Sequence, residues 1–216
     1  MKEQIIKAIE NEKLVVIVRG IERKDLIPLA EAMYAGGVRL LEITYSADGS
    51  TSDEETADRI KMLAERFDGR MYIGAGTVLT EKQVELTAAA GGRFIISPDT
   101  NEAVIKKTSY LGLVSMPGAL TPTEIQTAHK AGADFVKVFP AGNLGVEYVK
   151  SVKAPLSHIK MLAVGGINLE SIPDYKKIGI SGFGLSSNII DKKKVEAGDF
   201  ASITALAEKY VNLIKD

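Results

Sequence analysis

The sequence predicts an α/β protein, a (β/α)8 TIM barrel with an extra N-terminal helix over residues 2–12. Short apolar runs alternate with longer amphipathic segments along the whole chain of 216 residues. The runs recur about every 20 to 30 residues, the length of one strand plus a return helix. Strict alternation of strands and helices implies a parallel sheet covered by helices. Eight such units without a long linker favour closure into a barrel. A doubly wound open sheet is the competing architecture.

Eight apolar runs are the strand candidates. In order they are Leu14–Arg19, Leu40–Thr44, Tyr72–Ala75, Phe94–Ile96, Leu113–Met116, Phe135–Val138, Met161–Val164 and Gly182–Leu185. Amphipathic helical patterns fill the gaps between them. The segment before the first run is charged and amphipathic, so we expect it to form a helix that caps the bottom of the barrel.

Several of these helices have recognisable ends. Thr80-Glu81 and Thr121-Pro122-Thr123-Glu124 resemble N-caps that lead into helices. Three helices end in a similar way, in Ala35-Gly36-Gly37-Val38, Ala90-Gly91-Gly92-Arg93 and Ala131-Gly132-Ala133. A glycine just past a helix supplies a left-handed C-cap, and a strand then follows at once.

Composition narrows the classes of function. The length favours one domain over residues 1–216. The chain is 45% hydrophobic and 25% charged with a net charge of −1, which gives no electrostatic case for binding nucleic acid or an anionic membrane. It has no Cys, so disulfides and thiolate metal sites are excluded. The N-terminus lacks the apolar core of a signal peptide, and no apolar stretch reaches the roughly 18 residues of a membrane span. These features favour a cytoplasmic location.

Lys137 is the first candidate for chemistry. It interrupts an apolar strand, where Phe135, Lys137 and Phe139 share one face. An ammonium among such neighbours is partly desolvated, which lowers its pKa. A neutral amine is a nucleophile that forms a Schiff base with a carbonyl. The alternative is a lysine at a strand end that extends its ammonium to water.

Glu42 and Arg19 also stand on predicted strands. Glu42 lies inside Leu40–Thr44, where it is either a core carboxylate paired with a cation or an acid/base group beside Lys137. Arg19 ends the first strand. It could bind a substrate carboxylate in bidentate fashion or pair with Glu42, and the sequence alone leaves both options open.

The remaining strand ends are polar or glycine-rich, more so than a packed core requires. In a barrel of this type the active site lies at the C-terminal ends of the strands. Gly165-Gly166, followed by an expected helix start at Asn168, suits a phosphate held by backbone N–H groups. Ser186-Ser187 ends the next strand, where barrels also bind phosphate. Alone, a pair of glycines more often forms a turn.

Other polar residues carry less weight. His129 and His158 fall away from the strand ends and are expected at the surface. No cluster of His, Asp and Glu has the spacing of metal ligands, so neither a metal nor an organic cofactor is expected. Lys192-Lys193-Lys194 is expected to be a solvated loop.

Several strings together resemble the 2-keto-3-deoxy-6-phosphogluconate (KDPG) aldolase family, which includes 4-hydroxy-2-oxoglutarate aldolases. The resemblance covers nearly the whole chain in the right order. The strings are Gly36-Gly37-Val38-Arg39-Leu40-Leu41-Glu42-Ile43-Thr44, Gly74-Ala75-Gly76-Thr77-Val78-Leu79, Ile96-Ser97-Pro98, Met116-Pro117-Gly118, Phe135-Val136-Lys137-Val138-Phe139-Pro140-Ala141, Gly165-Gly166-Ile167 and Glu196-Ala197-Gly198-Asp199.

The resemblance implies a class I aldolase that cleaves a 2-keto-4-hydroxy acid to pyruvate and an aldehyde. Lys137 matches the Schiff-base lysine and Glu42 the general acid/base. The pyruvate pocket is matched by Thr77, Pro98 and Phe139, and the phosphate site by Gly165, Gly166 and Ser187. The full set of expected substrate-binding residues is Arg19, Thr77, Pro98, Pro117, Gly118, Phe139, Gly165, Gly166, Ser186 and Ser187. The family's usual assembly is a homotrimer.

The chain also departs from the family pattern. An Arg that the best-known members carry four residues after the catalytic Glu is here Ser46, and a longer segment over residues 47–53 follows it. The Thr that often precedes the glycine pair is Val164, and Leu185-Ser186 replaces a Gly-Gly. The lysine machinery is intact while the parts that recognise the rest of the substrate differ. Alternatives to KDPG are therefore 4-hydroxy-2-oxoglutarate or an unphosphorylated sugar acid. More distant alternatives are a phosphosugar isomerase or epimerase, and a non-catalytic phosphosugar-binding protein.

Overall fold

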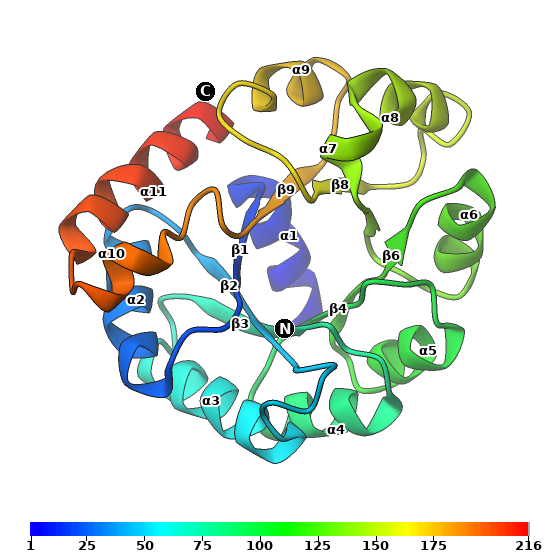
Figure 1. Ribbon diagram of the computed structural model, residues 1–216. Coiled ribbons are helices and arrows are strands. Elements are labelled where there is room, and N and C mark those ends of the chain that lie inside the picture. Colours follow the sequence, from blue (N-terminus) through cyan, green and yellow to red (C-terminus); the bar gives the residue numbers. More distant parts are fainter. Residues whose placement is uncertain (216) are drawn as a thin grey trace.

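The computed structural model describes residues 1–215 and contains a barrel of parallel strands surrounded by helices (Figure 1). The strands are β1 (Leu14–Val18), β2 (Leu40–Thr44), β3 (Tyr72–Gly76), β4 (Phe94–Ile96), β5 (Val114–Met116), β6 (Gly118–Ala119), β7 (Val136–Val138), β8 (Met161–Val164) and β9 (Gly182–Leu185). Every strand pair is parallel, in the order β5-β4-β3-β2-β1-β9-β8-β7-β6. The predicted barrel is confirmed, and the open doubly wound sheet is not formed.

The fifth predicted strand, Leu113–Met116, forms as β5, and an additional short strand, β6, follows it beyond Pro117. Proline has no N–H to donate to a strand ladder, so it interrupts regular pairing. β5 pairs with β4, and β6 pairs with β7. The Pro117 carbonyl still accepts a hydrogen bond of 2.8 Å from the Lys137 amide, so the residue between β5 and β6 is held to β7. The sheet thus has nine strands where the sequence predicted eight, and it is nearly closed.

The helices follow the predicted alternation. They are α1 (Lys2–Glu12), α2 (Arg23–Ala35), α3 (Asp53–Arg66), α4 (Glu81–Ala89), α5 (Glu102–Tyr110), α6 (Pro122–Lys130), α7 (Ala141–Leu144), α8 (Val146–Lys153), α9 (Ile172–Lys177), α10 (Lys192–Glu196) and α11 (Phe200–Lys215). Both predicted N-caps form capping boxes, from Thr80 with Gln83 and from Thr121 with Glu124. Each box satisfies two backbone N–H groups at a helix start.

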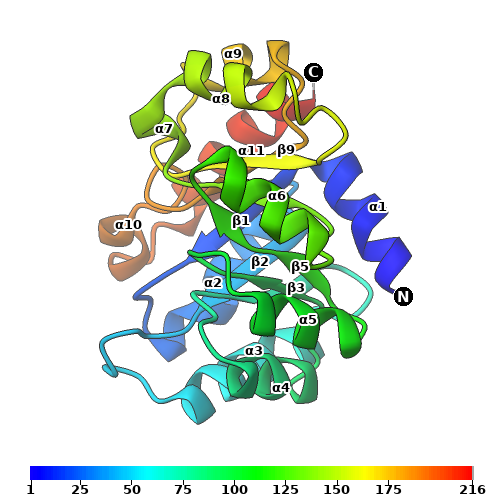
Figure 2. The same ribbon diagram turned by 90° about the vertical axis from the view of Figure 1, so that its right-hand side faces the viewer.

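Two separate apolar clusters hold the fold together. The outer one lies between the strands and the surrounding helices. The inner one fills the barrel with alternate strand residues, including Phe94 and Phe135, and with Ile5 and Ile9 of α1. The predicted cap is confirmed: α1 closes one end of the barrel, while α7 and α10 lie toward the other end (Figure 2). The end that α1 does not fill is the C-terminal end of the strands, where the sequence places the candidate functional residues.

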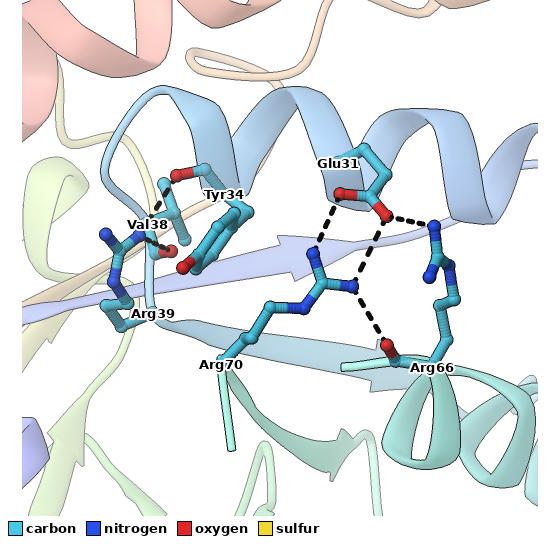
Figure 3. A network of polar contacts seen from close by, with 6 residues as sticks. All are labelled: Glu31, Tyr34, Val38, Arg39, Arg66 and Arg70. Atoms are coloured by element: carbon cyan, nitrogen blue, oxygen red, sulfur yellow. Dashed lines mark hydrogen bonds and ion pairs between the residues drawn. The ribbon is translucent and has the colours of Figure 1, made fainter. Parts of the chain in front are cut away.

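A polar network on the outer surface ties α2 to α3 (Figure 3). Glu31 of α2 forms ion pairs with Arg66 at 2.8 Å and with Arg70 at 3.3 Å. Tyr34 lies under two guanidinium groups, with Arg39 4.3 Å and Arg70 5.2 Å from its ring centroid. Partly exposed pairs of this kind contribute roughly 0–1 kcal/mol each. Their role here is to fix the two helices that flank β2, the strand that carries Glu42.

Candidate active site

A cavity of about 390 Å³ opens at the C-terminal ends of the strands and gathers most of the predicted functional residues. Its lining contains Ile17, Arg19, Glu42, Thr77, Pro98, Lys137, Phe139, Val164, Gly165, Gly166, Ile167, Gly184, Leu185, Ser186, Ser187 and Asn188. Residues from β1, β2, β7, β8 and β9 or the loops after them meet here, although they are distant in sequence. The structure therefore brings most of the residues predicted at strand ends into one cavity.

Lys137 lies in the middle of β7, and its side chain is buried, with 7% of its surface exposed. Its register neighbours are Gly118 of β6 and Leu162 of β8. The ammonium nitrogen Nζ lies 4.7 Å from the ring centroid of Phe139, which flanks the cavity. The lysine does not extend its ammonium to bulk water. It presents the amine to an enclosed space large enough for a small keto acid.

Glu42 lies on β2 and is 1% exposed, so its carboxylate is inside the barrel. Its Oε2 atom has no hydrogen-bond partner within residues 1–215. A Cβ atom built on Gly76 would lie 1.6 Å from Glu42 Oε1, so the carboxylate occupies the place of a side chain on β3. Glu42 and Lys137 form no direct ion pair in the described part of the chain. Both line the same cavity, which leaves room for a substrate between them.

Burial shifts both ionisable groups toward their neutral forms. It raises the pKa of Glu42, and the positive charges of Lys137 and Arg19 oppose that shift. Burial likewise lowers the pKa of Lys137, which the negative charge of Glu42 opposes and the positive charge of Arg19 reinforces. Desolvation is the first cause in each case. The cavity therefore favours a neutral amine beside a carboxyl group that can hold a proton.

Arg19 lies at the rim of the cavity, where β1 ends. Its Nη2 donates a hydrogen bond of 2.9 Å to Thr77 Oγ1. Thr77 follows Gly76 in a left-handed conformation, with φ of 55°. Of the two options for Arg19, direct pairing with Glu42 does not occur, because no ion pair joins them in the described residues. Arg19 lines the cavity, and in the described residues its guanidinium forms no hydrogen bond besides the one to Thr77.

The glycine pair after β8 lies in the cavity wall, but its surroundings differ from the prediction. The helix that follows begins at Ile172, not at Asn168. The Asn168 side chain instead accepts hydrogen bonds from the Glu170 and Ser171 amides, which closes a turn. Within residues 1–215, the amides of Gly165 and Gly166 donate to no protein acceptor. They remain available to an anion without a helix N-terminus behind them.

The two serines after β9 differ in what they can donate. The Ser186 hydroxyl donates a hydrogen bond of 3.0 Å to the Ile17 carbonyl, so its proton is not available to a ligand. Ser187 is exposed and its side chain forms no hydrogen bond in the described part of the protein. Next to it, the Asn188 side chain donates to the Ile167 carbonyl at 2.5 Å and fixes the loop. Ser187 is the hydroxyl of this pair that is free to bind a ligand.

Two of the expected substrate-binding residues, Pro117 and Gly118, are not part of the cavity lining. The Pro117 carbonyl nevertheless holds the backbone of Lys137. A Cβ on Gly118 would lie 2.4 Å from the Pro98 carbonyl oxygen, so this glycine allows close packing of neighbouring loops. His129 and His158 are exposed, as expected, and their rings meet edge to face at 5.3 Å between centroids.

Gly76 was missed by the sequence reasoning as a functional residue. The signal was present: Gly74 and Gly76 share the face of β3 that is turned into the barrel, and Gly74 is the register partner of Glu42 on β2. A strand glycine often marks a place where another group approaches closely. Here that group is the carboxylate itself.

A larger cavity of about 640 Å³ lies at the opposite end of the barrel, beside the start of α1. Its lining includes Met1, Gln4, Arg70 and Arg93. It lacks the buried amine and carboxyl pair, so we assign the chemistry to the smaller cavity. No helix within residues 1–215 is long and apolar enough to cross a lipid bilayer. Over the same range, no three His, Asp or Glu side chains cluster as metal ligands do.

Comparison with known families identifies the chain. The family model described as KDPG and KHG aldolase matches residues 5–206. The chain belongs to the KDPG and KHG aldolase family. It is therefore an aldolase, which is a carbon–carbon lyase.

Individual relatives agree with this assignment. The chain is 38% identical to a probable 2-dehydro-3-deoxy-6-phosphogalactonate aldolase of Rhizobium meliloti, over 86% of this chain and 85% of the relative. It is 32% identical to a 2-dehydro-3-deoxy-phosphogluconate aldolase of Haemophilus influenzae, over 99% of this chain and 98% of the relative. Among solved structures, a KDPG aldolase from Legionella pneumophila with pyruvate captured as a covalent carbinolamine superposes with a TM-score of 0.81. It has 26% identity and the match covers 94% and 96% of the two chains.

Proposed function

We propose that this aldolase cleaves a 2-keto-3-deoxy-6-phospho sugar acid to pyruvate and glyceraldehyde 3-phosphate through a Schiff base on Lys137. The observation that carries the proposal is the burial of one lysine and one glutamate in a single cavity at the strand ends. Lys137 is 7% exposed and Glu42 is 1% exposed, and burial shifts both pKa values toward the neutral forms. A neutral amine and a proton-carrying carboxyl group are the two reagents that a class I aldolase needs.

The first half of the reaction belongs to Lys137. Its neutral amine attacks the C2 carbonyl of the substrate and forms a carbinolamine. Loss of water, with a proton supplied by Glu42, gives the protonated Schiff base. This iminium ion is the electron sink for the next step. Because the amine already has a lowered pKa, a larger share of it is nucleophilic near neutral pH.

The second half belongs to Glu42. Its carboxylate accepts the proton of the C4 hydroxyl while the C3–C4 bond breaks, and the bonding electrons move into the iminium group. The products of this step are an aldehyde and the enamine of pyruvate on Lys137. Glu42 then returns the proton to C3, and water hydrolyses the Schiff base. Protein hydrogen bonds do not occupy Glu42 Oε2 in the described residues, so this atom is free to take part.

The rest of the cavity suits the two ends of the substrate. We assign the keto-acid end to Arg19, Thr77 and Phe139, because they line the same cavity as Lys137 and the Phe139 ring lies 4.7 Å from its amine. We assign the phosphate to the open amides of Gly165 and Gly166 and to the Ser187 hydroxyl. Neutral donors of this kind bind phosphate dianions in many proteins.

The configuration at C4 separates two candidate substrates. Relatives of this chain are named for phosphogluconate and for phosphogalactonate derivatives, and the relative at 38% identity carries the second name. Both epimers contain the same keto acid and phosphate, so the assignments above fit either one. Rates of pyruvate release from the two C4 epimers, measured at equal concentration, identify the preferred substrate.

Borohydride trapping tests the mechanism. Pyruvate plus borohydride should leave one reduced adduct on Lys137, which mass spectrometry of peptides locates. Lys137→Ala should abolish both the adduct and turnover. Lys160→Ala is a matched control, because Lys160 also faces a Phe ring, at 5.4 Å, but is exposed and paired with Glu10. A Lys137→Ala enzyme that keeps most of its activity would refute the Schiff base.

We extend the proposal to a cytoplasmic homotrimer, on the strength of the family resemblance. Light scattering at micromolar concentration should give three times the mass of one chain. A monomer at that concentration would contradict the assembly without affecting the proposed chemistry.

A further inference from the structure

Lys192 places a second cation beside Arg19, in a cavity that adjoins the active site. It is the first residue of α10, which packs beside α2 and α11 (Figure 1). Its side chain turns back over the end of β1: a Cβ atom built on Gly20 would lie 2.6 Å from Lys192 Nζ. Gly20 has φ of 63° and no side chain, so the backbone leaves this place open. Within residues 1–215, no carboxylate pairs with Lys192.

A second cavity of about 860 Å³, here called the outer cavity, adjoins the active site. The two cavities share the walls formed by Ile17, Arg19, Ser186, Ser187 and Asn188. Lys192 and Lys193 line the outer cavity only. The outer cavity thus lies next to the serine that we assign to the phosphate.

The outer cavity is positively charged although the chain as a whole carries a net charge of −1. Its lining contains three cations and one carboxylate, that of Asp191. This carboxylate already accepts a hydrogen bond of 2.9 Å from the Lys193 amide, because it caps α10. A cleft lined by one sign of charge attracts ligands of the opposite sign and raises their local concentration.

We propose that Lys192 is a specificity-determining residue that binds the phosphate group of the substrate. This inference rests on the proposed function. The donors at Gly165, Gly166 and Ser187 are neutral, so they leave a phosphate dianion without a counter-charge. Lysine supplies a compact charge on a flexible stem, which moves to a phosphate without the fixed geometry that arginine needs. The same interaction selects against substrates that lack the phosphate.

The test compares Lys192→Gln with Lys209→Gln. Both changes remove one positive charge from an exposed side chain, but Lys209 lies on α11 and lines neither cavity. We expect Lys192→Gln to raise KM for the phosphorylated acid roughly five- to tenfold, with kcat within about twofold. The difference from the native enzyme should shrink in 1 M salt, because salt screens exposed charges. Lys192→Arg should restore most of the lost affinity.

Two further arms separate the sources of any effect. For the unphosphorylated sugar acid, which has no anionic group at its distal end, Lys192→Gln should leave kcat/KM at the native value. Inorganic phosphate should inhibit the Lys192→Gln enzyme more weakly than the native one. Equal KM values for Lys192→Gln and Lys209→Gln, or an equal loss with the phosphorylated and unphosphorylated sugar acids, would overturn the inference.

Trapping distinguishes this inference from the function on which it rests. Lys192→Gln should form the pyruvate adduct with borohydride as fully as the native enzyme does. If the native enzyme forms no adduct, the proposed function fails, whatever happens at Lys192. If both enzymes form it and their KM values agree, only the assignment of Lys192 fails.

Discussion

Replacing Gly76 by alanine tests whether the position of the Glu42 carboxylate, and not its mere presence, sets the rate. Gly76 ends β3, and its missing side chain leaves the space that the carboxylate occupies. A Cβ atom there would lie 1.6 Å from Oε1 and 2.2 Å from Cδ of Glu42. The glutamate side chain can rotate away, whereas the strand backbone is fixed by pairing with β2. In the Gly76→Ala variant, the contact between the new methyl group and Glu42 is therefore relieved by movement of the carboxylate.

The size of that movement follows from the contact distances. Ordinary van der Waals contact begins at 3.4 Å, so Oε1 must retreat by roughly 1.8 Å. A displacement of about 1 Å in a reacting group can lower a rate by about 10²-fold. We therefore expect Gly76→Ala to lower kcat by roughly 10²-fold while Glu42 stays in the sequence. The barrel should keep most of its stability, because the atoms that move belong to the end of one side chain.

Gly74→Ala is the matched control. It lies two residues earlier on the same strand, but its Cβ would lie 2.3 Å from the ring of Phe94, in the apolar interior. Overpacking of this kind lowers the free energy of unfolding by about 1–3 kcal/mol. Pyruvate release, coupled to NADH oxidation by lactate dehydrogenase, gives kcat, and urea unfolding gives stability. A Gly76→Ala enzyme with kcat within threefold of native, or equal losses of kcat in both variants, would refute the reasoning.

Three other perturbations address the remaining groups. Glu42→Gln keeps the shape but removes proton transfer, so the turnover number should fall by roughly 10²–10⁴-fold; an unchanged value would make Glu42 a structural residue. Arg19→Gln removes a cation that lowers the pKa of Lys137, so that pKa should rise. Less amine is then neutral at a given pH, and the acidic limb of the pH profile of pyruvate trapping should move to higher pH; an unmoved limb would contradict this. Ser46→Arg alone should change KM for the phosphorylated acid little. The Asp48 carboxylate lies beside residue 46, and its pKa is lowered to about 2. It is therefore ionised at neutral pH and should pair with the new guanidinium. Ser46→Arg combined with Asp48→Asn should lower KM more, and equal KM values in the single and double variants would count against that role for Asp48.

The alternation of the fold could be predicted from sequence, because it depends on local patterns. The N-terminal helix over residues 2–12 was predicted at the bounds that the structure shows for α1. The break between β5 and β6 was not predicted, although Pro117 inside an apolar run is a signal for it. The expected helix start at Asn168 was wrong, because the Asn168 side chain closes a turn before α9 begins. Side-chain capping competes with helix initiation, and sequence alone does not decide between them.

The site could be predicted only as far as single residues interrupt a pattern. Lys137 and Glu42 are charged residues inside apolar strands, so both could be identified as candidates from the sequence alone. The role of Gly76 depends on strand register, which pairs Glu42 with Gly74, and on the Glu42 side chain, which extends to Gly76 two residues further along β3. Lys192 was expected in a solvated loop, and only the path of the chain after β9 returns it to Gly20. Long-range placement of this kind leaves no local pattern in the sequence.

The layered interior of the barrel explains how one cavity shifts two pKa values in opposite directions. Below the site, the interior is filled by large apolar side chains such as Phe94 and Phe135, and α1 seals the end beneath them. Water therefore cannot reach the charged groups from that side, and burial dominates both shifts. At the level of the site, Gly76 replaces a side chain with empty space, which Glu42 enters. The interior next to α1 is thus packed with apolar side chains, whereas the interior at the strand ends is open. This arrangement places the Lys137 amine and the Glu42 carboxyl group in one cavity that a keto acid can enter.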